Sequence, residues 1–204
     1  QNADQMIKQM PLYWGPQAFT AGPMYMGAIA IFLFVLGLVL IKGPMKWWIV
    51  GVSLLALFLG WGRNFMFLSS FFYDYIPLYN KFRVPSMILI VLQLTIPLLG
   101  IYTLNKILNG EYEKKTLLKG LKIAVGVTGG ICALFALLPG LAGSFVSPAD
   151  SQYPDWLRQY LPQDRESLLR SDAFRSLVFI LLACIVIWAW MIQKIKSTHV
   201  VIVM

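Results

Sequence analysis

Three cationic side chains lie among aromatic and polar residues in one segment of the chain, residues 62–85. The cations are Arg63, Lys81 and Arg83, and the polar residues beside them are Asn64, Asp74, Tyr79 and Asn80. Arginine offers a planar fork that binds a phosphate through two hydrogen bonds, and lysine adds a point charge. Aromatic faces suit the apolar side of a sugar ring or an isoprenoid tail. This combination predicts a site for a lipid-linked phosphate.

A generic interpretation of the same residues stays open. Basic side chains at the ends of membrane spans commonly extend toward lipid phosphates, and Tyr and Trp commonly form interfacial belts. Asp74 is the one acid among these aromatics, and we expect it to orient Arg83 or Lys81 rather than to perform catalysis.

A second segment, residues 13–25, precedes the first long apolar run and also contains polar and aromatic residues. Gln17, beside Trp14, could supply hydrogen bonds to a sugar. The alternative is a structured turn that leads into a membrane span, and we favour the turn.

The elements that would position these residues are membrane-spanning helices, because five long apolar runs contain no charged side chain. The runs cover residues 25–41, 47–61, 86–104, 123–142 and 176–193. A helix needs about 20 apolar residues to cross the hydrocarbon core of a bilayer. The predicted fold class is all-α, a polytopic transmembrane helix bundle with five spans and the start of a sixth at residues 200–204.

Charge placement predicts the orientation of the spans, with the N-terminus outside. Nine lysines lie in the connections 42–46, 105–122 and 194–199, with only Glu111 and Glu113 beside them. Cytoplasmic loops collect Lys and Arg, so these connections are assigned to the inside. The outer segments are then residues 1–23, 62–85 and 143–175, which hold eight basic and seven acidic residues.

The net charge of +8 follows from this asymmetry, and we therefore predict no nucleic-acid partner. The chain is 58% apolar and only 13% charged, which excludes a water-soluble globule. All nine inner cations are lysine, whereas six of the eight outer cations are arginine. Insertion does not distinguish the two residues, but recognition of phosphate or carboxylate on the outer face does.

Local patterns predict several further elements. Residues 65–76 are too apolar for a free loop and should lie along the interface or enter the membrane partway. Residues 105–122 favour a short surface helix, and residues 156–161 favour a short amphipathic helix on the outer leaflet. Small residues predict close helix packing at Ala56 with Gly60 and at Gly126 with Gly130.

No ionisable side chain lies in any of the five runs, which disfavours an ion-coupled transporter. We find no metal-ligand spacing and no cofactor motif, and the lone His199 reads as an interfacial residue. Because the chain starts at Gln1 and stops inside an apolar run, we interpret residues 1–204 as one transmembrane domain fragment of a larger protein.

The two segments considered first carry a resemblance to the YfhO-type bacterial membrane proteins, most clearly to the large Bacteroidetes versions. It covers most of residues 10–105. The residues that carry it are Tyr13, Trp14, Gly15, Gln17, Phe19, Thr20, Gly22, Pro23, Tyr25, Gly27 and Ala28, then Trp61, Gly62 and the run Tyr79-Asn80-Lys81-Phe82-Arg83-Val84-Pro85-Ser86-Met87.

This family is similar to the multi-pass GT-C glycosyltransferases, which take a sugar from a polyprenyl-phosphate carrier outside the cytoplasmic membrane. The resemblance implies that Arg83 contacts the carrier phosphate and that the catalytic acid or base lies outside this fragment. It also implies a multi-pass protein of the bacterial cytoplasmic membrane. Two alternatives are a transporter or flippase of a lipid-linked glycan and a non-catalytic assembly subunit. The sequence indicates neither the sugar, the acceptor nor the oligomeric state.

Overall fold

A computed structural model describes residues 12, 14, 25–77, 79–81 and 85–203. These residues form helices and their connections, and none of them belongs to a β-strand, which confirms the all-α prediction. The chain divides into two compact units. We call residues 23–129 with 179–204 the bundle unit and residues 1–22 with 130–178 the polar unit, and we describe each separately.

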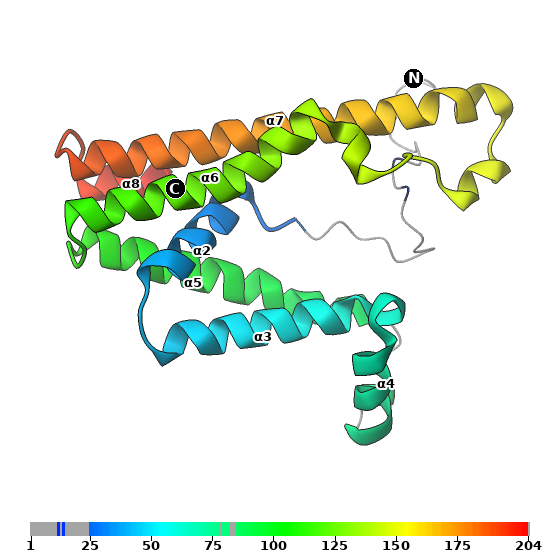
Figure 1. The fold of residues 1–204 in the computed structure, drawn as a ribbon, viewed down its shortest axis with the longest axis horizontal. Coiled ribbons are helices and arrows are strands. Elements are labelled where there is room, and N and C mark those ends of the chain that lie inside the picture. Colours follow the sequence, from blue (N-terminus) through cyan, green and yellow to red (C-terminus); the bar gives the residue numbers. More distant parts are fainter. Residues whose placement is uncertain (1–11, 13, 15–24, 78, 82–84, 204) are drawn as a thin grey trace. The chain divides into compact units, whose positions relative to one another are not determined.

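In the bundle unit, one helix forms within each of the first three apolar runs (Figure 1). These helices are α2 (Ala28–Leu40), α3 (Pro44–Gly60) and α5 (Ile90–Leu108). Between α3 and α5 lie the short helix α4 (Met66–Tyr75) and the three-ten helices η1 (Gly62–Phe65), η2 (Tyr79–Lys81) and η3 (Pro85–Leu89). Pro44 occupies the first turn of α3, where its missing N–H has no intrahelical partner to lose. Helix α5 packs against both α2 and α3.

The contact between α2 and α5 depends on one glycine in each helix. A Cβ atom added at Gly100 of α5 would lie 3.1 Å from the Leu33 Cβ of α2. One added at Gly37 of α2 would lie 3.1 Å from the Leu99 Cγ of α5 and would clash with the Thr103 hydroxyl. Small residues at a crossing let two backbones approach closely, which is a common way to pack helices in lipid.

The contact between α3 and α5 contains a polar pair. The hydroxyl oxygens of Ser53 and Thr95 are buried, lie 2.8 Å apart and share a hydrogen bond. Ala56 of α3 is buried, and the side chain of Leu89 of η3 lies directly against Gly60 at the end of α3. The predicted packing role of Ala56 and Gly60 is therefore consistent with the structure.

The remaining helices are α6 (Lys114–Leu137), α7 (Asp155–Met191) and α8 (Ser197–Val203). The first half of α6 and the end of α7 belong to the bundle unit, as does α8. The predicted surface helix over 105–122 is wrong, because α5 continues to Leu108 and the lysine-rich residues form the first turns of α6. Lysine has a good helix propensity, so these turns extend the apolar helix that follows.

Two other expectations also change. Residues 156–161 belong to the 37-residue helix α7 and form no separate element, although Pro162 lies inside that helix. Among the residues that the structure describes, no atom comes within 4 Å of a Cβ added at Gly126 or at Gly130. The small face of α6 is therefore open in this chain.

The polar unit consists of the end of α6, two three-ten helices and the first half of α7. The three-ten helices are η4 (Pro139–Ala142) and η5 (Pro148–Gln152). Residues 143–147, which belong to no helix or strand, join them. This unit contains the buried charged residues that are discussed below.

Three helical stretches are long and apolar enough to cross a membrane, namely Met87–Leu108, Lys114–Leu137 and Leu157–Met191. Only 33%, 28% and 22% of their most apolar windows is buried, so large apolar surfaces face outward. Exposed apolar area of that extent is rare on a soluble monomer. The α2 and α3 helices, of 13 and 17 residues, are shorter than a full span.

Candidate functional site

The predicted cationic and aromatic residues lie around α4 in the bundle unit. Arg63 and Asn64 belong to η1, before α4, and Tyr79, Asn80 and Lys81 form η2, after it. Asp74 is near the end of α4, and both Asp74 and Lys81 are exposed. Two of the predicted residues, Gln17 and Arg83, lie outside the described residues.

Helix α4 has no buried residue, which is consistent with the prediction that this segment lies along an interface. Ring contacts join it to its neighbours. Phe72 of α4 meets Tyr79 of η2 with ring centroids 5.6 Å apart, and Phe71 stacks with Tyr75 at 5.2 Å. The Ser69 hydroxyl donates to the Gly62 carbonyl at 3.1 Å and so ties α4 to η1.

Asp74 was expected to orient Arg83 or Lys81. Among the side chains that the structure describes, no ion pair joins Asp74 to Lys81. A contact with Arg83 falls outside the described residues. The segment therefore has an exposed acid, Asp74, just before the end of α4 and an exposed base, Lys81, after it in η2.

Trp14 belongs to the polar unit, not to the unit that contains α4. Its ring lies 5.3 Å from the ring of Phe145, at an interplanar angle of 57°. Phe145 is buried and has a φ of 55°, a left-handed conformation that a bulky residue seldom adopts. Trp14 thus contacts a strained aromatic residue next to the buried charges of that unit.

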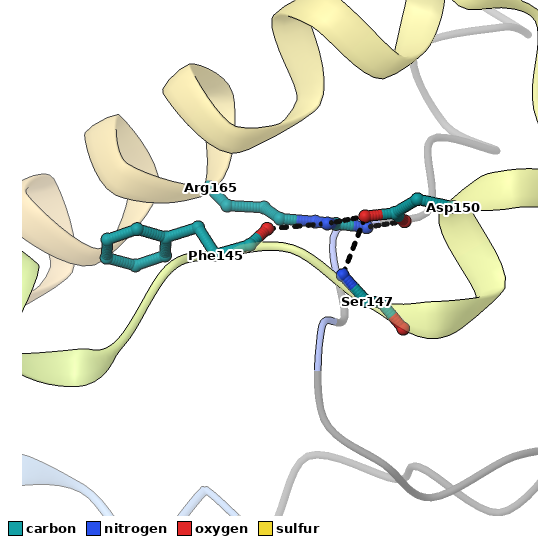
Figure 2. A network of polar contacts seen from close by, with 4 residues as sticks. All are labelled: Phe145, Ser147, Asp150 and Arg165. Carbon is teal, nitrogen blue, oxygen red and sulfur yellow. Dashed lines mark hydrogen bonds and ion pairs between the residues drawn. The ribbon is translucent and has the colours of Figure 1, made fainter.

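A buried ion pair that the sequence analysis did not identify lies at the centre of the polar unit (Figure 2). Arg165 of α7 donates from Nη1 to Asp150 Oδ2 and from Nη2 to Asp150 Oδ1, each at 2.8 Å. Its Nη1 also donates to the Phe145 carbonyl at 2.7 Å. The Arg165 side chain is 0% exposed and the Asp150 side chain 9% exposed. Such a two-point pair satisfies both groups with matched geometry.

Hydrogen bonds with Ser147 at the start of η5 fix the position of Asp150. The Ser147 N–H donates to Asp150 Oδ2 at 2.7 Å, and the Asp150 N–H donates back to the Ser147 carbonyl at 2.9 Å. This reciprocal bonding across three residues resembles a capping box at a helix start. The Arg165 hydrogen bond, followed by that of the Ser147 N–H, holds the pKa of Asp150 below its ordinary value despite burial.

Two sequence signals could have led to this pair. The first is the spacing of Ser147 and Asp150 at the start of a turn that Pro148 favours. The second is the position of Arg165, one helical turn after Leu161, so that both lie on the same face of α7. Leu161 and Arg165 are both 0% exposed.

The outer arginines are mostly engaged by carboxylates. Besides Arg165, three others form exposed ion pairs along α7, and these are Arg158 with Asp155 at 3.2 Å, Arg170 with Glu166 at 3.2 Å and Arg175 with Asp172 at 3.0 Å. Four of the six arginines assigned to the outside therefore have carboxylate partners. The argument that this arginine excess reflects phosphate recognition now rests on Arg63 and Arg83.

A polar pocket of about 550 Å³ lies beside the buried pair, within the polar unit. Its lining includes Ser147, Asp150, Ser151, Asp155, Arg158 and Gln159. Carboxylate, guanidinium, amide and hydroxyl groups can each bond to the hydroxyls of a polar ligand. Asp150 is committed to Arg165 and ionised, so it can accept hydrogen bonds but cannot serve as a proton donor. Among the described residues, no three His, Cys, Asp or Glu side chains cluster in a way that could hold a metal ion.

These observations define the class of protein: a helical chain with three candidate membrane spans, an exposed cationic and aromatic segment, and a polar unit organised by a buried ion pair. Comparison with protein-family models, curated proteins and solved structures finds no significant match.

Proposed function

We propose that the chain is the membrane core of a glycosyltransferase-like protein that uses a polyprenyl-phosphate-linked sugar outside the bacterial cytoplasmic membrane. The observation that carries the proposal is the arrangement around α4. An exposed aromatic helix lies between η1, which contains Arg63, and η2, which contains Lys81. The motif that resembles the YfhO-type proteins follows directly and places Arg83 in the same segment.

The proposed mechanism is electrostatic. Cations at the headgroup level would hold the carrier phosphate by charge-assisted hydrogen bonds, and the aromatic rings would line the path of the sugar and the lipid. Neutralising the leaving phosphate would stabilise the charge that develops as the sugar carbon is attacked. This chain's own part is binding, and the catalytic acid or base would come from another part of the protein.

The proposal includes a five-span topology with the N-terminus outside. Each of the three long helices and each of the shorter helices α2 and α3 overlaps one of the five apolar runs. Helix α2, about 20 Å long, would need adjoining residues or a locally thinned bilayer to cross. A flippase would require a polar path through the spans. The buried polar side chains described in the bundle unit are all uncharged hydroxyls, and they belong to Ser53, Thr95, Thr103 and Thr128. This composition favours the glycosyltransferase-like proposal over a flippase.

Binding of a polyprenyl-phosphate sugar by the purified protein in nanodiscs tests the proposal. We expect Arg83→Ala to weaken binding about 10- to 100-fold, the cost of losing a charge-assisted contact. Arg170→Ala is the matched control, because Arg170 is an outer arginine already paired with Glu166. Equal affinity of the Arg83→Ala protein and the unaltered protein would remove the phosphate role from this segment.

A further inference from the structure

A second pocket, of about 550 Å³, lies in the bundle unit near the lysine-rich ends of α6 and α7. Its walls come from the α5–α6 connection, the start of α6 and the turn between α7 and α8. The residues that matter here are Tyr112, Lys114, Leu117, Trp190, Met191 and Lys196. The pocket therefore combines two cations with apolar and aromatic walls.

The turn between α7 and α8 has a defined geometry that places Lys196 in the wall. Gln193 adopts a φ of 61°, and the Lys194 N–H donates to the Ala189 carbonyl at 3.0 Å, which closes the end of α7. The Trp190 indole N–H donates to the Ser197 hydroxyl at 3.0 Å and joins the two helices across the turn.

The two lysines of this pocket form no ion pair within the part of the chain that the structure describes. Among the residues that the structure describes, neither Lys114 nor Lys196 takes part in an ion pair or a side-chain hydrogen bond. The nearby Glu111 is engaged by Lys106, and Glu113 is not in the pocket wall. Two unneutralised ammonium groups at one small pocket attract an anion, and phosphate is a common partner of lysine.

An apolar groove of about 410 Å³ occupies the next turns of the same two helices. Its lining includes Leu121 and Gly126 of α6 and Ile185 and Trp188 of α7. Leu117 of the pocket precedes Leu121 by one helical turn, and Met191 of the pocket follows Trp188 by three residues, so the groove continues along the faces that form the pocket. The open space at Gly126 adds to the width of this groove.

We propose that the pocket and the groove bind one anionic phospholipid. The headgroup phosphate lies between Lys114 and Lys196, and an acyl chain lies in the groove along α6 and α7. Basic pockets between membrane helices suit acidic headgroups, because a nearby lysine favours the anionic lipid over a zwitterionic one. This inference needs only that the helices lie in a membrane, and it does not depend on the proposed sugar chemistry.

Native mass spectrometry of the purified protein measures the affinity for phosphatidylglycerol and for phosphatidylcholine. We expect a preference for phosphatidylglycerol, and we expect K114Q/K196Q to weaken that lipid's binding about 10- to 30-fold. The matched control, K115Q/K194Q, removes the same charge from lysines outside the pocket wall and should change the affinity less than about threefold. Equal losses in the two double variants, or no preference between the lipids, would overturn the proposal.

A third variant tests the groove and separates a lipid from a soluble phosphate. G126L places a side chain into open space and should fold. We expect it to weaken phosphatidylglycerol binding and to leave the weak binding of glycerol phosphate unchanged. If glycerol phosphate binds the unaltered protein as tightly as phosphatidylglycerol does, the pocket is a site for a soluble phosphate and the lipid assignment is wrong.

Discussion

The side chain of Arg165 has no exposure to solvent, yet it carries a full charge. Removing such a group from water costs several kcal/mol, and only a partner of matched geometry offsets that cost. Asp150 supplies two oxygens, and the Phe145 carbonyl receives a third hydrogen bond. The hydrogen bond from Arg165 therefore ends on the carbonyl of a residue with a left-handed backbone, the kind of conformation that persists only where the surrounding structure supports it.

We predict that Arg165→Met destabilises the polar unit by about 3–5 kcal/mol, because the buried Asp150 then loses its cationic partner and keeps only the hydrogen bond from the Ser147 N–H. Thermal unfolding in detergent and hydrogen exchange of residues 143–155 measure the loss. Arg170→Ala should cost less than about 1 kcal/mol, because its ion pair is exposed. A double variant that replaces both partners, Arg165→Met with Asp150→Leu, should recover part of the stability. If Arg165→Met and Arg170→Ala lowered stability by the same amount, the buried pair would have no special role.

The polar unit should also lose stability in acid. Because the pKa of Asp150 is lower in the folded state, its contribution is complete above the unfolded value of about 3.9 and is lost as pH falls through the folded value. Unfolding measured between neutral pH and strong acid should show little change until that range is reached. Asp150→Asn should flatten this part of the profile, and an unchanged profile would argue against the assignment.

The outer segments together hold eight basic and seven acidic residues, and this near balance does not indicate which of the charges pair. Asp150 and Arg165 are 15 residues apart and lie in different elements, so no helical spacing connects them. The cations of segment 62–85 form a local pattern with the neighbouring aromatic residues, and their role in binding phosphate stays a prediction. Whether those cations bind phosphate depends on side-chain geometry that a pattern does not contain.

At the scale of helices, the approach of α2 to α5 depends on Gly37. We predict that Gly37→Ala lowers stability by about 1–3 kcal/mol, because the added methyl group would overlap the buried Thr103 hydroxyl. Gly51→Ala is the matched control, since no described atom lies within 4 Å of a Cβ added there. Thermal stability in nanodiscs measures both changes. A tolerated Gly37→Ala would mean that the two helices are packed less closely than described.

Most helices were predictable from apolar runs, whereas several ends were not. The run at 86–104 predicts much of α5, and the run at 47–61 predicts α3 apart from its first turn. The polar starts of α6 and α7 were predicted as separate short helices and not as continuations of the spans, because polarity ended each predicted span while helix propensity continued the helix. Gly126 and Gly130 show that a small-residue pattern permits close packing without requiring it.

For the whole molecule, the orientation in the membrane is the property that most needs a direct test. We predict that a cysteine at Lys81 reacts with an impermeant maleimide in intact cells, whereas one at Lys115 reacts only after permeabilisation. Cys132 and Cys184 are free thiols and would be replaced by alanine first. The expectation follows from the lysine-rich connections being inside. The opposite labelling pattern would invert the topology and remove the proposed outer site.

Helix α7 is about 55 Å long, almost twice the thickness of a bilayer's hydrocarbon core. Its first 21 residues hold four arginines, each paired with a carboxylate, and its last 16 hold no charge. The two ends of this helix thus differ in chemistry, and different forces stabilise them. Salt weakens exposed ion pairs but leaves lipid contacts intact, so rising ionic strength should fray this helix from its charged end alone.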